Sequence, residues 1–182
     1  METYISILRG INVSGQKKIL MSDLKDIFNK LAFKNITTYI QSGNVVFQSE
    51  AKLSDIELAE KIGTAILKKY DFKVPVVIRR QAELEKILLT NPFIKDKNIN
   101  IERLYVTFLS EKPNPVLKES TDKLDYSPDK FYIMEKEVFL YTPGGYGETK
   151  LSNNFFENKL KITATTRNWK TVNKLFEIAS SI

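Results

Sequence analysis

Hydrophobic positions in residues 1–80 switch between the spacing of a strand and that of a helix. Residues 4–8 form a short β-prone apolar run, and the apolar side chains between residues 24 and 31 recur on one helix face. Ser54 and Glu57 have the spacing of a capping box, which predicts the start of a second helix. The expected elements are a strand at 4–8, a helix over 24–31, strands at 36–40 and 45–47, a helix over 54–66 and a strand at 74–78. This β-α-β-β-α-β order is that of a ferredoxin-like fold.

The pattern over residues 81–182 repeats most of this plan. It predicts a linking helix at 81–89, a strand at 105–109, a weak helix at 116–124, strands at 131–134 and 138–141, and two closing helices, the last from about residue 168. No final strand is visible in the pattern. The sequence therefore predicts an α+β protein of two ferredoxin-like halves. Residues 1–80 form the first, and residues 81–182 form a variant second half that includes the linking helix and the C-terminal helices.

Two polar turns, at residues 9–13 and 41–45, follow the first and second expected strands. A right-handed β-α-β crossover makes these strands parallel, so both turns are expected at the same edge of the sheet. Guanidinium, carboxamide and backbone N–H groups suit a phosphate or carboxylate. The candidate ligand-binding residues here are Arg9, Gly10, Asn12, Gln41, Ser42, Gly43 and Asn44. The alternative is that the asparagines only satisfy turn backbone groups and that Arg9 pairs with an acid.

A third candidate segment is Thr166, Arg167 and Asn168, where Thr166 or Asn168 is expected to cap a helix. A helix start exposes N–H groups that can bind an anion. We therefore expect Arg9 and Arg167 to share an anion site in a groove between the halves. For Trp169, core or interdomain packing is the favoured interpretation.

Three motifs in order carry a resemblance to a known family. They are Arg9-Gly10-Ile11-Asn12-Val13, the run T-Y-I-Q-S-G-N-V at residues 38–45, and Thr165-Thr166-Arg167-Asn168-Trp169. On these motifs the chain resembles the bacterial DUF1697 family. The resemblance implies a two-part α+β architecture and supports the positions of the candidate residues, but it implies no reaction and no role for them. Ser14-Gly15 departs from the Gly-Gly of the family pattern.

Composition narrows the chemistry further. The chain has no cysteine and no histidine, so thiolate nucleophiles, disulfides and histidine catalysis are excluded.

Residues 10–18 partly resemble a phosphate-binding P-loop. However, no Ser or Thr follows Lys17 to hold Mg²⁺, and the sheet is expected to be antiparallel, so a P-loop is not predicted. No metal site is indicated, and the sequence leaves any cofactor unknown. Without a basic signal start or a long apolar window, a cytoplasmic location and no membrane association are expected.

The 28 basic and 22 acidic residues give a net charge of +6. The excess lies in two acid-free stretches, one from Thr3 to Ser22 and one from Asn158 to Phe176. Such stretches attract anions, although lysine-rich surfaces also serve solubility. We expect a small anionic ligand; nucleic-acid binding, for which the aromatic RNA-recognition signatures are missing, and a protein-interaction module remain alternatives. The sequence identifies no catalytic residue and leaves both enzymatic activity and oligomeric state open.

Overall fold

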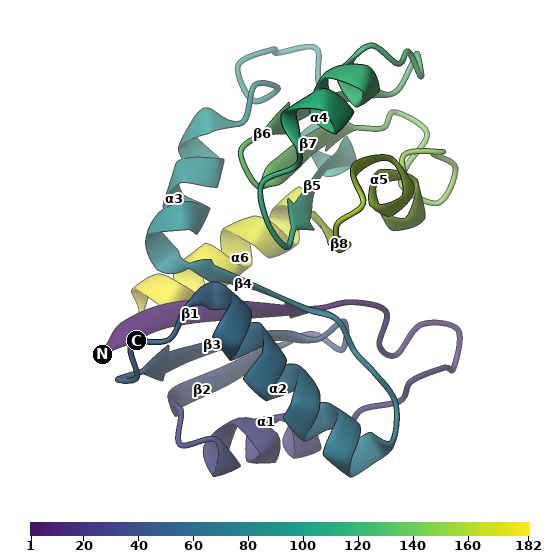
Figure 1. The fold of residues 1–182 in the computed structure, drawn as a ribbon. Helices are drawn as coiled ribbons and strands as arrows, with labels where there is room; N and C mark the ends of the chain where they lie inside the picture. The colour runs from purple at the N-terminus through teal and green to yellow at the C-terminus, as the bar shows by residue number, and fades with distance from the viewer. The chain divides into compact units, whose positions relative to one another are not determined.

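The structure is a computed structural model that describes residues 1–182 and divides into two compact units (Figure 1). The first unit comprises Met1–Glu85 and Lys174–Ile182, and the second comprises Lys86–Asn173. The C-terminal residues thus belong to the first unit, where Gln81 Nε2 donates a hydrogen bond to Ser180 Oγ at 3.2 Å. The sequence pattern placed them in the second half, because a linear pattern carries no sign that the chain returns. Whether each unit is an independent domain stays a prediction.

The first unit contains a four-stranded antiparallel sheet. Its elements are β1 (Glu2–Leu8), α1 (Met21–Lys30), β2 (Lys34–Tyr39), β3 (Asn44–Ser49), α2 (Asp55–Tyr70) and β4 (Val76–Arg80), followed by α3 (Gln81–Thr90). The strand order is β2-β3-β1-β4, and each neighbouring pair is antiparallel. Because β1 and β2 both run antiparallel to β3, they are parallel to each other, and their carboxyl ends reach the same edge. Helices α1 and α2 lie on one face of this sheet (Figure 1).

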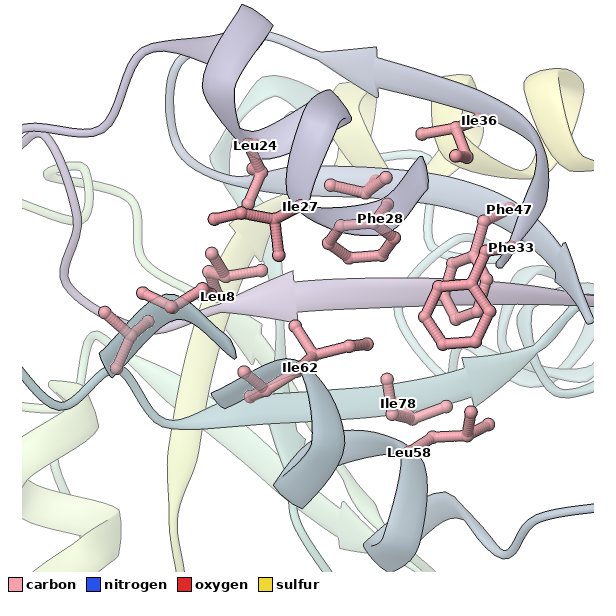
Figure 2. Close-up of a cluster of buried hydrophobic side chains, with 14 of the residues drawn as sticks. Leu8, Leu24, Ile27, Phe28, Phe33, Ile36, Phe47, Leu58, Ile62 and Ile78 are labelled. Carbon is pink, nitrogen blue, oxygen red and sulfur yellow. The ribbon is translucent and has the colours of Figure 1, made fainter. Parts of the chain in front are cut away.

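The core of the first unit fills the space between this sheet face and the two helices (Figure 2). The predicted helix periodicity is observed: α1 buries Leu24, Ile27 and Phe28. Phe47 of β3 lies at the centre of the aromatic contacts, with ring centroids 4.5 Å from Phe33 and 5.2 Å from Phe28. Burial of each such side chain contributes about 1.5–3 kcal/mol to the stability of the fold. This contribution determines which side chains of β1 and β3 face the helices.

The predicted capping box is present at the start of α2. Glu57 N donates to Ser54 Oγ at 3.3 Å, and Ser54 N donates to Glu57 Oε2 at 2.8 Å. Both free backbone donors are therefore satisfied reciprocally, as the spacing of these two residues predicts.

The second unit is built on another four-stranded antiparallel sheet. After α3 come a short 3₁₀ helix (Ile101–Arg103), β5 (Leu104–Leu109), α4 (Pro115–Asp122), β6 (Lys130–Met134), β7 (Glu137–Tyr141), α5 (Asn153–Leu160), β8 (Ala164–Asn168) and α6 (Trp169–Ser180). The strand order β6-β7-β5-β8 repeats that of the first sheet, with every neighbouring pair antiparallel. Helix α6 continues from the second unit into the first.

The expectation that the second half has no final strand is wrong. Residues Ala164–Asn168 form β8, which pairs with β5 so that Thr166 lies opposite Thr107 and Arg167 opposite Val106. This strand has the polar sequence Ala-Thr-Thr-Arg-Asn, so it shows no alternation of apolar and polar residues. Backbone pairing with β5 and the β-branched threonines define it instead. None of the helices is long and apolar enough to cross a bilayer.

Candidate functional site

The segment after β1 is wound tightly by residues in the left-handed region. Arg9 N donates to Pro75 O at 2.9 Å, which holds the end of β1 to the segment before β4. The chain then doubles back: Asn12 N donates to Lys17 O at 3.2 Å, and Gln16 N donates to Val13 O at 2.9 Å. Positive φ angles occur at Gly10, Asn12, Ser14, Gly15 and Lys17. Asn and Gly adopt this region most readily, which explains part of the Arg9–Val13 motif.

Asn12 connects this segment to the turn between β2 and β3. Its Nδ2 atom donates to Gln41 O at 2.8 Å and to Ile19 O at 3.0 Å, and its Oδ1 atom accepts from Ile19 N at 2.9 Å. Both amide hydrogens are therefore used inside the protein. Asn12 fixes the two turns to each other, as expected for neighbouring turns at one sheet edge.

Hydrogen bonds of the Asn44 side chain stabilise the second turn, between β2 and β3. Asn44 is fully buried, and its Nδ2 atom donates to Tyr39 O at 3.1 Å and to Ser42 Oγ at 2.9 Å. Gly43 has φ +81°, and a Cβ atom there would lie 2.7 Å from Ile11 Cδ1 and 2.8 Å from Leu8 Cβ. Gly43 is thus required by both conformation and space, and Asn44 holds the hairpin in shape.

A hollow of about 320 Å³ lies where these turns meet the start of α1. We refer to it as the Lys18 hollow. It is lined by Asn12, Gly15, Lys18, Ile19, Leu20, Met21 and Gln41. Of the predicted site residues, only Asn12 and Gln41 belong to this lining. Arg9, Gly10, Ser42, Gly43 and Asn44 build the surrounding turns and are not among the lining residues.

Two polar side chains of the Lys18 hollow have no partner in the protein. Lys18 Nζ and the Gln41 carboxamide make no hydrogen bond or ion pair, whereas Lys17 Nζ donates to Lys73 O at 2.8 Å. Lys18 was not among the predicted site residues. The signal that could have identified it is the acid-free basic stretch from Thr3 to Ser22, but sequence cannot tell which lysine there is already bonded.

The predicted residues of the second unit lie in β8 and at its end. Thr166 and Arg167 are strand residues, so neither begins a helix, and this expectation is corrected. Asn168 Oδ1 accepts from Thr171 N at 2.8 Å and so caps α6, which begins at Trp169. The cap was predicted for Thr166 or Asn168; only Asn168 has this role because the strand continues through Arg167.

Thr166 is the centre of a hydroxyl network in this unit. Its Oγ1 atom donates to Asn153 Oδ1 at 2.7 Å, accepts from Tyr146 OH at 3.0 Å, and lies 2.7 Å from Thr107 Oγ1. Four side chains from β5, β8, the start of α5 and the loop before it are joined in this way. The network satisfies partly buried polar groups, which is a structural role for Thr166.

Arg167 is held along its own strand. Its Nη1 atom donates to Thr165 Oγ1 at 3.0 Å and to Thr166 O at 2.8 Å. Burial lowers the pKa of this guanidinium from its usual 12.5 to about 10, against the opposing effect of Tyr146. Arg167 therefore stays cationic at neutral pH. Arg9 belongs to the first unit and Arg167 to the second, and the expectation that they share an anion stays a prediction.

The chemistry available in the Lys18 hollow is binding chemistry. Its lining contains one cation, two carboxamides and three apolar side chains, and none of these residues is an acid. A group that accepts a proton near neutral pH is therefore missing from its walls. No cluster of acidic side chains is arranged to hold a metal ion.

These features describe an α+β protein with two four-stranded antiparallel sheets and a hollow at one edge of the first. The chain belongs to the DUF1697 family, proteins of unknown function, whose family model matches residues 1–139. The match includes both turns of the Lys18 hollow and ends before Thr165. A solved structure with a similar fold is the conserved bacterial protein SP0830 from Streptococcus pneumoniae, at 23% identity and a TM-score of 0.76 over 98% of each chain. None of the curated proteins matches this chain.

Proposed function

We propose that the protein binds a small molecule that carries a phosphate or carboxylate, and that its anionic group lies in the Lys18 hollow. One observation carries the proposal: the exposed side chains of Lys18 and Gln41 line the same hollow, and both are free of hydrogen-bond and ion-pair partners in the protein. An ammonium group offers three donors and a carboxamide two. Together they match the oxygen atoms of an anion better than any other common ligand group.

The walls of the hollow are already fixed, which favours binding. The three hydrogen bonds of the Asn12 carboxamide hold Asn12 against Ile19 and against the backbone of Gln41. Gly43 packs against Leu8 and Ile11 beneath the same turn. A ligand therefore loses little binding energy to ordering these loops.

The start of α1 has free backbone N–H groups, which are partly positive, although the acidic Asp23 in its first turn opposes this potential. Leu20 occupies the N-cap position in an extended conformation, and its own side chain makes no capping hydrogen bond. The partial positive charge of a helix N-terminus favours a nearby anion by about 0.3–1 kcal/mol. The helix N-terminus therefore only supplements the charge of Lys18, and the helix N-terminus alone would not define a site.

We also propose that both units are ferredoxin-like. Support comes from the element order β-α-β-β-α-β in each unit and from the repeated strand orders β2-β3-β1-β4 and β6-β7-β5-β8. Since ferredoxin-like folds have many functions, this fold assignment does not indicate the ligand.

A protein-interaction module is the second candidate. Large apolar side chains are exposed in the first turn, at the start of α1 and just before the second turn, namely Val13 at 58%, Leu20 at 66% and Ile40 at 48%. Exposed apolar side chains that gather in one region are typical of protein-binding surfaces. Sedimentation or light scattering that detects a stable dimer would favour this candidate over a small-molecule site.

The proposed function is tested by thermal denaturation with a panel of nucleotides, sugar phosphates and carboxylates. At 100 times its Kd, a ligand stabilises the folded protein by roughly 2.7 kcal/mol, which raises the melting temperature measurably. Lys18→Ala and Gln41→Ala should remove the shift. Lys25→Ala is the matched control, because Lys25 is an exposed lysine of α1 with no partner and lies outside the lining. A shift that survives Lys18→Ala, or no shift with any compound, contradicts the proposal.

A further inference from the structure

We infer that the occupant of the Lys18 hollow is amphipathic, with one anionic head group bound by Lys18 and Gln41 and a compact apolar body against Leu20 and Met21. This inference rests on the proposed function and names its class of ligand. Aliphatic or aromatic carboxylates and phosphate monoesters belong to this class; inorganic anions and polyphosphates do not.

The polar capacity of the hollow limits the charge of the ligand. Asn12 lines it, but both of its amide hydrogens are bonded to Ile19 O and Gln41 O. Lys17 is absent from the lining and its ammonium group donates to Lys73 O. Lys18 is therefore the single cation that faces the ligand, which suits one head group and leaves the several charges of a polyphosphate uncompensated.

The remaining lining is apolar. Ile19 is 3% exposed, Met21 is partly buried and packs on the core, and Leu20 is 66% exposed. Leu20 and Met21 thus supply most of the accessible apolar surface of the lining, and we refer to these three residues as the apolar wall. An inorganic anion would leave this wall in contact with water, whereas a ligand with an apolar body would cover it.

Leu20 is an unusual choice for its position. It is the N-cap residue of α1, where Ser, Thr, Asp and Asn are strongly preferred and leucine is among the least favourable residues. The side chain is neither buried in the core nor used as a cap. A residue that breaks a local rule of helix stability is most often found at a functional site, and Leu20 lies at a wall of the hollow.

The size of the hollow restricts the body of the ligand. About 320 Å³ lies at the lower end of the range of roughly 300–1,000 Å³ that small-molecule sites span. A short alkyl chain or one aromatic ring fits this volume better than a nucleotide does. We therefore expect affinity to rise with chain length until the hollow is filled.

The test is isothermal titration calorimetry of the full chain with acetate, butanoate, hexanoate and hexanol. Affinity should rise about fourfold for each added methylene, and hexanol, which has the body without the charge, should bind far more weakly than hexanoate. Hexyl phosphate compared with hexanoate then shows which head group Lys18 prefers. Amide chemical shifts of Gly15, Leu20 and Met21 should change on binding.

Two variants separate the head group from the body. Lys18→Gln should weaken hexanoate binding roughly tenfold to a hundredfold, the range lost with a hydrogen bond to a charged group. Leu20→Ser removes the most exposed apolar side chain of the lining and supplies a favoured N-cap, so it should fold normally while affinity rises less steeply with chain length. Lys25→Gln should match the unmodified protein.

The outcomes distinguish this inference from the proposed function. Binding that depends on Lys18 but is equal for acetate, butanoate and hexanoate overturns the amphipathic ligand and leaves the anion site standing. Hexanoate binding that is unchanged in Lys18→Gln, or no binding of any anion, overturns both. A chain-length dependence that is as steep in Leu20→Ser as in the unmodified protein, with folding intact, overturns the contact between Leu20 and the body of the ligand.

Discussion

The Asn12 side chain donates a hydrogen bond to the backbone carbonyl of Gln41 at 2.8 Å, although the two residues belong to different turns. The same carboxamide also donates to Ile19 O and accepts from Ile19 N. Asn12 is thus a structural residue that joins the two turns, while the Gln41 side chain, which has no partner in the protein, lines the Lys18 hollow. Of the two interpretations of the turn motifs, backbone satisfaction describes Asn12, whereas ligand binding stays a proposal for Gln41.

Replacing Asn12 tests this division. Asn12→Gly keeps the positive φ of 54° accessible and removes all three hydrogen bonds, so the free energy of unfolding should fall by about 1–3 kcal/mol. Asn35→Gly is the matched control, because Asn35 also has a positive φ, of 49°, but donates one exposed hydrogen bond to Gln48. Urea denaturation measures both variants. Equal stabilities for the two variants would mean that Asn12 does not hold the turns together.

Gly43 and Gly10 provide a matched pair that separates backbone conformation from steric fit. Both have positive φ angles, so an alanine at either costs roughly 1–2 kcal/mol in the left-handed region. A Cβ atom at Gly43 would also collide with Leu8 and Ile11, whereas nothing lies within 4 Å at Gly10. We expect Gly43→Ala to lower the free energy of unfolding by about 1–3 kcal/mol more than Gly10→Ala. Similar urea midpoints for the two variants would contradict this account of the turn.

Sequence patterns predicted the elements whose apolar side chains recur at a regular spacing. Leu24, Ile27 and Phe28 indicated α1, and the spacing of Ser54 and Glu57 indicated the start of α2. These signals are local, and their physical cause lies within one turn of helix or one sheet face. The edge at which the two turns meet followed from strand direction alone, since β1 and β2 must be parallel in this crossover.

The remaining features depend on contacts between distant parts of the chain. Strand β8 is polar, and its pairing with β5 rather than its own pattern makes it a strand. Lys17 and Lys18 are adjacent and chemically identical, yet only Lys17 is bonded, to a carbonyl that lies far along the chain. Which of the two is available to a ligand is therefore decided by tertiary structure and has no local signal.

The hydroxyl network of the second unit should contribute to its stability. Thr166→Val keeps the shape of the side chain but removes the oxygen that bonds Tyr146, Asn153 and Thr107. Partly buried polar groups are then left without partners, and the free energy of unfolding should fall by about 1–3 kcal/mol. Thr37→Val in β2 is the control, because the half-buried Thr37 side chain makes no hydrogen bond. Thr166→Val as stable as Thr37→Val would show that the network contributes little.

Tyr70 and Asp23 should give the first unit a stability that depends on pH at both extremes. The Tyr70 hydroxyl donates to Asp23 Oδ2 at 2.7 Å, and this bond, with Lys69 Nζ at 3.1 Å from the same oxygen, lowers the pKa of Asp23 below its usual 3.8. A carboxyl whose pKa is lower in the folded state stabilises the fold above pH 3.8, and that contribution is lost as the pH falls through the folded value. Burial and the same hydrogen bond raise the pKa of Tyr70 from 10 to about 12, so its contribution is present below pH 10 and is lost between pH 10 and 12. Tyr70→Phe should therefore move the pKa of Asp23 up toward 3.8 in a carboxyl NMR titration and remove one tyrosine that ionises late in an ultraviolet titration.

Tyr132→Phe is the control for this prediction. It removes an exposed hydroxyl without a partner and should leave the Asp23 titration unchanged. An Asp23 titration that is the same in Tyr70→Phe and in the unmodified protein would mean that the Tyr70 hydroxyl does not hold this carboxylate in solution.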